Sequence, residues 1–334
     1  MVRTLKAGAT VLAICLMVAH GRAQQGPRGT QGALPVAPDS PLGTGPYKAL
    51  MEMDAALMTH TAYRPADLTV FGATKLPIIA WGNGACANAG DAFRPFLTEI
   101  ASHGYLAVAI GPIVGGARAS GPVAPGAVAT PGAGAPPAAG APPVRAGGPA
   151  TSSSQLVDAI DWAVRENTRR TSKYFGKLDT TKIAVMGQSC GGVQAVAASV
   201  DPRVTITVGW NTGLVGPRTT GPIMEDVPKE TLEKLHGPVA YFTGDPGDVA
   251  HPNAADDFKR LEAIGRLPAL HAWKDGMTHG GTYREENGGE MARIAVAYLA
   301  WRLKGDQTAG RMFTGPNCGL CTTLGWHVSR ARIE

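Results

Sequence analysis

A serine flanked by glycines is the residue best placed for nucleophilic chemistry in this sequence. The segment Gly187-Gln188-Ser189-Cys190-Gly191 matches the pattern G-x-S-x-G. An apolar run, KIAVM, precedes the motif and a small-residue run, GVQAVAASV, follows it. The motif therefore falls on an expected strand–turn–helix junction, where glycines allow close backbone approach and the serine hydroxyl is exposed at the turn. Ser189 is the predicted nucleophile.

A serine hydroxyl needs a base to take its proton, and His279 is the predicted base. It lies in a turn after LHAW, the last apolar run before a C-terminal helix. An acid that orients the base is expected one strand earlier, in the loop that begins GDPGD. Asp248 is favoured because it comes just ahead of the next helix. Asp245 is the alternative, although Asp before Pro also has an ordinary role in turns.

Two backbone amides are needed to stabilise the oxyanion that forms during acyl transfer. One is expected to be the N–H of Cys190, directly after the nucleophile. The other is expected in the turn Gly82-Asn83-Gly84-Ala85-Cys86 after the apolar run PIIAW. We favour Ala85 there and keep Cys86 and Asn83 as alternatives. If these two turns meet, a Cys86–Cys190 disulfide would hold both donors in position.

Alternating strands and helices must position these residues. Apolar runs predict strands at residues 77–81, 106–110, 182–186, 204–208, 239–242 and 270–273. Helices are expected between or after them, at residues 91–103, 152–169, 191–199, 253–265 and 287–303. Repeated units of this kind predict an α/β fold with a doubly wound, mostly parallel sheet.

The segments outside the predicted strands and helices differ from them in amino-acid composition. Residues 1–23 combine a positive start, a short apolar run and small residues, which is the pattern of a cleaved signal peptide. Residues 24–46, rich in Gly, Pro and Gln, predict a flexible mature terminus. Residues 115–149, built from Ala, Gly, Pro and Val, predict a disordered loop inside one domain. That domain is expected to span residues 47–304, with a C-terminal tail at 305–334.

Cleavage near Ala23 would place the chain outside the cytoplasm, as a secreted or periplasmic protein. It would lower the formal net charge from +5 to +2 and the cysteine count from 5 to 4. So weak a charge argues against nucleic acid as a partner, and no other run is long enough for stable membrane insertion. An even number of cysteines in an exported chain predicts two disulfides among Cys86, Cys190, Cys318 and Cys321.

Neither a metal nor an organic cofactor is expected. The pair Cys318-Gly-Leu-Cys321 lacks the second ligand pair that a zinc site would need. It is instead a candidate for a local disulfide. Acyl transfer by a serine, a histidine and an acid requires no further group.

From about Thr61 to Lys304 the sequence resembles the α/β-hydrolase superfamily. It is most similar to the dienelactone-hydrolase-like and poly(ethylene terephthalate)-hydrolase-like branches. The similar stretches are IIAWGNGACA, EIASHGYLAVAIG, KIAVMGQSCGG, GDPGDVAHP and THGG. The resemblance implies a serine esterase that acts on a small-molecule or polymer ester.

The same resemblance suggests a pocket residue and also shows differences. Trp210 resembles an aromatic residue that polyester hydrolases use beside the scissile ester. Those enzymes usually carry Met after the nucleophile and an aromatic residue in the oxyanion turn, where this chain has Cys190 and Ala85. The resemblance therefore implies generic ester hydrolysis. A peptidase or amidase with the same triad, or a non-catalytic binding protein on this scaffold, are the alternatives.

Overall fold

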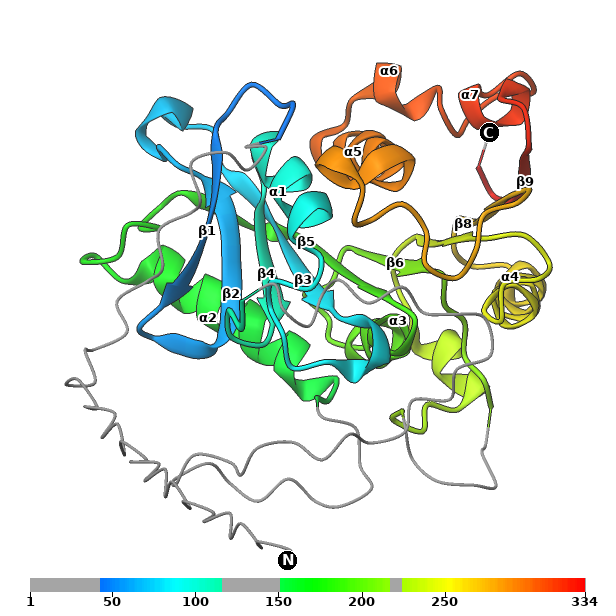
Figure 1. Ribbon diagram of the computed structural model, residues 1–334, viewed down its shortest axis with the longest axis horizontal. Coiled ribbons are helices and arrows are strands. Elements are labelled where there is room, and N and C mark those ends of the chain that lie inside the picture. Colours follow the sequence, from blue (N-terminus) through cyan, green and yellow to red (C-terminus); the bar gives the residue numbers. More distant parts are fainter. Residues whose placement is uncertain (1–42, 116–150, 217–223, 334) are drawn as a thin grey trace, which may run out of the picture. The chain divides into compact units, whose positions relative to one another are not determined.

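The computed structural model describes residues 43–115, 151–216 and 224–333. The predicted signal peptide at 1–23 lies outside the described residues, as do most of the 24–46 terminus and all but the first residue of the 115–149 insert. The described residues form a central sheet with helices packed against it (Figure 1).

The sheet has nine strands within the described part of the chain, in the order β1-β2-β4-β3-β5-β6-β7-β8-β9. The strands are β1 (Ala49–Asp54), β2 (Leu57–Pro65), β3 (Leu76–Gly82), β4 (Leu106–Ile110), β5 (Leu178–Gln188), β6 (Ile206–Trp210), β7 (Val239–Thr243), β8 (Ala269–Lys274) and β9 (Trp326–Ala331). Strands β4, β3, β5, β6, β7 and β8 pair in parallel, whereas β1, β2 and β9 pair antiparallel. The predicted α/β class with a mostly parallel sheet is confirmed.

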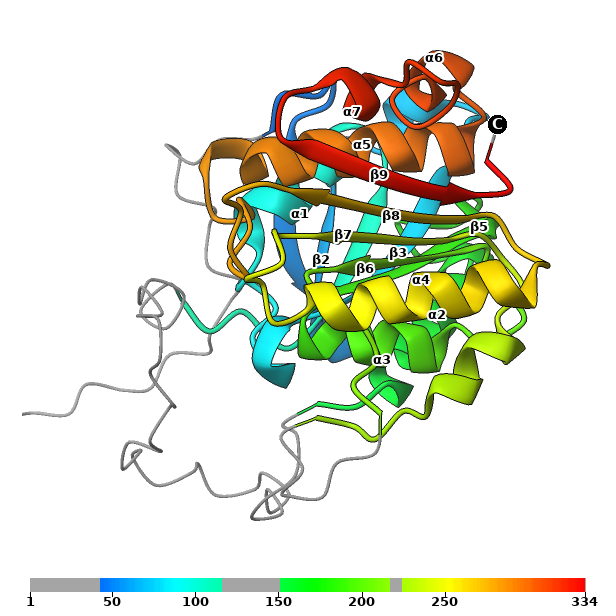
Figure 2. The ribbon, with the colours of Figure 1, turned by 90° about the vertical axis from the view of Figure 1, so that its right-hand side faces the viewer.

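Five longer helices cover the two faces of this sheet (Figure 2). One face carries α1 (Arg94–Ser102) and α5 (Gly289–Lys304), and the other carries α2 (Ser154–Thr168), α3 (Cys190–Ala198) and α4 (His251–Ile264). Short 3₁₀ turns lie at η1 (Thr69–Phe71), η2 (Gly84–Cys86), η3 (Lys229–Lys234) and η4 (Glu286–Gly288). No helix in the described ranges combines the length and the hydropathy needed to cross a bilayer.

Alternate residues of the central strand β3 point into different layers, as strand geometry requires. Ile79 and Trp81 belong to the apolar cluster that includes α1 and α5, whereas Ile78 and Ala80 belong to the cluster that includes α2. All four residues are fully buried. A parallel strand covered on both faces has an unbroken apolar sequence, which is why PIIAW shows no alternation.

Residues 305–333, which fall in the expected C-terminal tail, are part of the same packed unit. After α5, the chain forms α6 (Gln307–Gly310), α7 (Gly319–Thr322) and β9. Strand β9 pairs with β8 along its whole length. Phe313, Cys318 and Leu320 belong to the same apolar cluster as α5. The tail prediction was wrong because β9, with the sequence WHVSRA, is a half-buried edge strand with few apolar residues.

Candidate active site

Ser189 lies at the apex of the turn between β5 and α3. Its φ of 53° and ψ of −119° define a strained backbone conformation for a residue other than glycine. Residues at and just after the end of β6 bond to both the N–H and the carbonyl of Ser189. The Ser189 N–H donates to the carbonyl of Trp210 over 3.0 Å, and the Thr212 hydroxyl donates to the carbonyl of Ser189 over 2.6 Å. The turn that carries the Ser189 hydroxyl is therefore stabilised by hydrogen bonds to Trp210 and Thr212.

Three glycines allow α3 to begin in direct contact with the strands. A Cβ on Gly191 would lie 2.1 Å from the carbonyl carbon of Gly82, and one on Gly187 would lie 2.2 Å from the carbonyl oxygen of Gly191. Backbone atoms cannot yield to such contacts, so a side chain at either position would push α3 away from β3 and β5. The glycine spacing of the motif thus has a packing cause.

The three residues predicted as a triad meet in one line of hydrogen bonds. Nε2 of His279 lies 2.9 Å from Oγ of Ser189, and Nδ1 of His279 lies 2.7 Å from Oδ1 of Asp248. The three residues follow β5, β7 and β8, and the carboxyl ends of these parallel strands share one edge of the sheet. The side chain of His279 is 37% exposed and that of Asp248 is fully buried. The imidazole is therefore reachable from solvent, whereas the acid is enclosed.

Asp248 receives four hydrogen bonds. Besides His279, Oδ1 accepts the N–H of Ala250, while Oδ2 accepts the N–H of Gly244 and the amide of Asn211. Burial works to raise the pKa of Asp248, but these hydrogen bonds, led by that from His279, hold its pKa below the ordinary value. An ionised carboxylate only accepts, so Nδ1 of His279 is the donor in this bond; in a neutral imidazole with this tautomer, Nε2 is the acceptor.

Asp245, the alternative acid, occupies a different place in the same loop. Its Oδ1 accepts the N–H of Gly247 and its Oδ2 accepts the N–H of Gly276. Across the described residues no hydrogen bond joins it to His279. Of the two candidates, the structure brings Asp248 to the imidazole and uses Asp245 to close two turns.

Other histidines near this edge are bonded elsewhere. His271 is hydrogen-bonded to Thr243 over 3.0 Å, and His251 lies 3.3 Å from the carbonyl oxygen of Gly244. Burial, together with neighbouring His251, lowers the pKa of His271 to about 4, so this imidazole stays neutral near pH 7. Both rings line a groove of about 460 Å³ between α4 and strands β8 and β9, and none of the three triad residues lines it.

The predicted oxyanion turn is the 3₁₀ turn η2 after β3. Ala85 and Cys86 have φ values of 55° and 49°, so two consecutive non-glycine residues are held in the left-handed region. Asn83 braces the turn, since its buried side-chain amide donates to the carbonyls of Ala87, Ala89 and Ile110. Ala85 itself is exposed. Ala85 therefore lies at the surface of the turn, whereas the side chain of Asn83 is buried and stabilises the turn through its hydrogen bonds.

A disulfide joins this turn to the turn that carries Ser189. Cys86 and Cys190 are bonded, with Cα atoms 5.2 Å apart and a sequence separation of 104 residues. Cys318 and Cys321 form a second, local disulfide. Both predicted pairings are confirmed. Since Cys86 follows Ala85 and Cys190 follows Ser189, the two segments expected to supply oxyanion amides are covalently linked.

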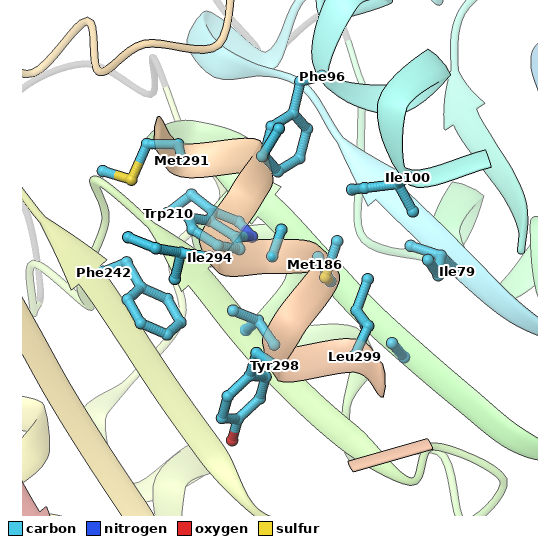
Figure 3. Close-up of a cluster of buried hydrophobic side chains, with 14 of the residues drawn as sticks. Ile79, Phe96, Ile100, Met186, Trp210, Phe242, Met291, Ile294, Tyr298 and Leu299 are labelled. Atoms are coloured by element: carbon cyan, nitrogen blue, oxygen red, sulfur yellow. The ribbon is translucent and has the colours of Figure 1, made fainter. Parts of the chain in front are cut away.

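Trp210, predicted to line a substrate pocket, is buried in the core instead. Its ring is fully buried and stacks on Phe242 with ring centroids 4.7 Å apart, while Phe96 meets it edge-on at 5.4 Å. Figure 3 shows the ring beside Ile294 of α5. The prediction was wrong because the residue ends β6 with its side chain on the covered α1–α5 face, and only its carbonyl reaches the site.

Two polar residues at strand ends were missed by sequence reasoning. Gln188, the last residue of β5, donates its side-chain amide to the carbonyl of His279 over 3.1 Å. Asn211, the first residue after β6, donates to Asp248 over 2.7 Å. Both are polar and buried directly beside apolar strands, and this position at the carboxyl edge of a parallel sheet was the signal available in the sequence.

Comparison with known proteins does not assign a family. No protein-family model matches this chain, and no curated protein matches it at a significant level. Among residues 43–115, 151–216 and 224–333, no group of three or more His, Cys, Asp or Glu side chains is arranged to hold a metal ion. The function is therefore argued from the geometry of the site.

The two disulfides provide a matched test of the covalent link at the site. A cross-link stabilises by restricting the unfolded chain, and the effect grows with the length of the closed loop. The 104-residue separation of Cys86 and Cys190 corresponds to about 4–5 kcal/mol, and the 3-residue separation of Cys318 and Cys321 to about 1–2 kcal/mol. We expect the double variant C86A/C190A to lose more free energy of unfolding in urea than C318A/C321A. Equal losses, or the reverse order, would contradict the assigned pairing.

Proposed function

We propose that this protein is a serine hydrolase that cleaves carboxylic esters through an acyl-enzyme intermediate. The observation that carries the proposal is the continuous hydrogen-bonded line from Ser189 through His279 to Asp248, with distances of 2.9 and 2.7 Å. These are the contacts that an activated serine requires. The strained turn at Ser189 and the order serine, acid, histidine along the chain add support, because both are typical of α/β-hydrolases.

In the first half of the proposed reaction, Oγ of Ser189 attacks the ester carbonyl and His279 takes the hydroxyl proton on Nε2. The resulting imidazolium is stabilised by the buried carboxylate of Asp248, which does not itself take the proton. The carbonyl oxygen becomes an oxyanion, and we assign its two donors to the amides of Ala85 and Cys190. The bond to the alcohol then breaks, and His279 returns the proton to the leaving oxygen.

In the second half, water enters and the same groups act again. His279 takes a proton from water, the hydroxide attacks the acyl carbon, and the oxyanion forms at the same amides. Collapse releases the carboxylic acid and returns the proton to Oγ of Ser189. The reaction consumes one ester and one water, so its balance requires no redox partner.

We assign the sheet to the α/β-hydrolase type, and the substrate to small or polymeric carboxylic esters. Support for the fold type comes from the run of parallel strands β3, β5, β6, β7 and β8, whose carboxyl ends carry the site. Burial of Trp210 removes one of the features that suggested a polyester hydrolase, and Cys190 and Ala85 depart from the residues usual in those enzymes. Generic ester hydrolysis is therefore favoured over polymer hydrolysis.

We further propose that the protein works outside the cytoplasm. Disulfides persist in oxidising compartments, and the structure contains two. The sequence pattern of residues 1–23 points to export in the same way. A secreted or periplasmic hydrolase is consistent with both observations.

Replacement of the nucleophile tests the proposal. With short-chain p-nitrophenyl esters, Ser189→Ala should lower kcat by at least about 10⁴-fold, because the acyl-enzyme no longer forms. Ser199→Ala is the control, since Ser199 lies at the other end of α3 and donates to the carbonyl of Ala195. The control should keep kcat within about threefold. Ester turnover by Ser189→Ala near the wild-type rate would refute the assignment.

A second comparison tests which carboxylate orients the base. Asp248→Asn keeps the size of the side chain but favours the wrong imidazole tautomer, and we expect kcat to fall about 10³- to 10⁴-fold. Asp245→Asn should remain within about threefold of wild type, because Asp245 contacts loop amides and not His279. If Asp245→Asn is the more damaged variant, the acid has been assigned to the wrong residue.

A further inference from the structure

A second polar line continues from Asp248 into the interior of the protein. Asn211 is fully buried, and its Nδ2 donates to Oδ2 of Asp248 over 2.7 Å. The same nitrogen donates to the carbonyl of Thr278, the residue before His279, over 3.3 Å. On its other side, Oδ1 of Asn211 accepts the hydroxyl proton of Tyr283, which is 1% exposed. The three loops that follow β6, β7 and β8 are thus joined through one buried amide.

The orientation of this amide is determined by its partners. A flipped Asn211 would turn its oxygen toward the carboxylate of Asp248 and the carbonyl of Thr278, and both of these groups are acceptors. Burial, with the nearby charge of Asp248, raises the pKa of Tyr283 well above its ordinary value, so its hydroxyl stays protonated and able to donate. Tyr283 therefore holds the amide oxygen, and the Nδ2 protons are directed at the acid.

The backbone around Asn211 reaches the nucleophile as well. Asn211 has a φ of 41°, in the left-handed region that Asn tolerates better than most residues. Its N–H donates to the carbonyl of Phe242 over 2.7 Å. Its neighbours Trp210 and Thr212 both form hydrogen bonds with the backbone of Ser189. The turn at residue 211 is consequently the point at which the nucleophile, the acid and the histidine loop are fixed relative to one another.

We propose that Asn211, oriented by Tyr283, is a positioning residue of the active site. The hydrogen-bonded line that runs from Ser189 through His279 to Asp248 would then continue through these two residues. The inference rests on the proposed hydrolase function. Asn211 holds Oδ2 of Asp248 so that Oδ1 faces the imidazole, and it holds the carbonyl of Thr278 so that His279 stays beside the nucleophile. Because Asn211 is buried and lies behind the acid, it acts on kcat and leaves KM unchanged.

Two shape-preserving variants test the proposal. Asn211→Asp keeps the side-chain outline and the tolerance for positive φ, but it turns an acceptor toward Asp248 in place of a donor. Tyr283→Phe removes only the hydroxyl. The matched control is Tyr298→Phe, since Tyr298 is fully buried in the same apolar cluster as Tyr283. In the part of the chain that the structure describes, no hydrogen bond joins its hydroxyl to Asn211 or to the three residues of the triad.

Turnover of p-nitrophenyl acetate and proton NMR give two independent measurements. We expect kcat to fall about 10- to 100-fold in Asn211→Asp and about 2- to 10-fold in Tyr283→Phe, with KM within about twofold in both. Tyr298→Phe should match wild type. The far-downfield proton resonance of the bond between His279 and Asp248 should be shifted or lost in the first two variants and unchanged in the control.

The outcomes separate this inference from the proposed function. If Ser189→Ala is inactive while Asn211→Asp and Tyr283→Phe keep both the wild-type kcat and the wild-type resonance, the positioning role is overturned and the hydrolase stands. If wild-type protein hydrolyses no ester, the proposed function fails, and the resonance in the variants still decides whether Asn211 and Tyr283 orient the acid. A rise in KM without a change in kcat would also contradict the positioning role.

Discussion

The site depends on the close approach of backbone to backbone at Gly82, Gly187 and Gly191. These glycines bring the first turn of α3 against the ends of β3 and β5, at separations that no Cβ would permit. The chain between β5 and α3 has to reverse within one residue, and Ser189 takes the strained conformation that results. The energetic cost of that strain is offset by the surrounding packing and by two hydrogen bonds, one that the Ser189 N–H donates to Trp210 and one that its carbonyl accepts from Thr212. A hydroxyl raised on such a turn points away from the sheet toward the neighbouring loops.

The parallel sheet supplies those loops. Successive strands β5, β6, β7 and β8 end at one edge, so residues far apart in sequence come within hydrogen-bonding distance without any long side chain. His279 is 90 residues from Ser189, and Asp248 is 31 residues from His279. Each of these segments is held by contacts besides those within the line of Ser189, His279 and Asp248. Gln188 bonds to the carbonyl of His279, the amides of Gly244 and Ala250 bond to Asp248, and a disulfide holds the turn at Cys86. The three side chains are therefore held in place by contacts of their loops as well as by the bonds between them.

The sequence predicted the parts of the structure that follow from local pattern. Parallel strands buried on both faces leave unbroken apolar runs, so the six central strands were found close to their observed bounds, and the glycine motif located the sharp turn at Ser189. The antiparallel strands β1, β2 and β9 were missed, because polar residues interrupt the apolar residues of strands such as LMTHTAYRP and WHVSRA. The face on which Trp210 lies depends on strand register, and a resemblance between sequences does not fix that register. The contact between Asn211 and Tyr283 joins residues 72 positions apart in the sequence, and no local sequence pattern predicts such a contact.

Covalent labelling of the intact protein with a fluorophosphonate, followed by peptide mapping, tests the central claim most directly. The reagent reacts with a serine only when a base removes its proton beside oxyanion donors. We predict one label per chain, on the peptide that contains Ser189, and no label when His279 is replaced by Ala. Absence of labelling in the wild-type protein, or a label on a different serine, would show that the hydrogen-bonded line from Ser189 through His279 to Asp248 does not activate the hydroxyl.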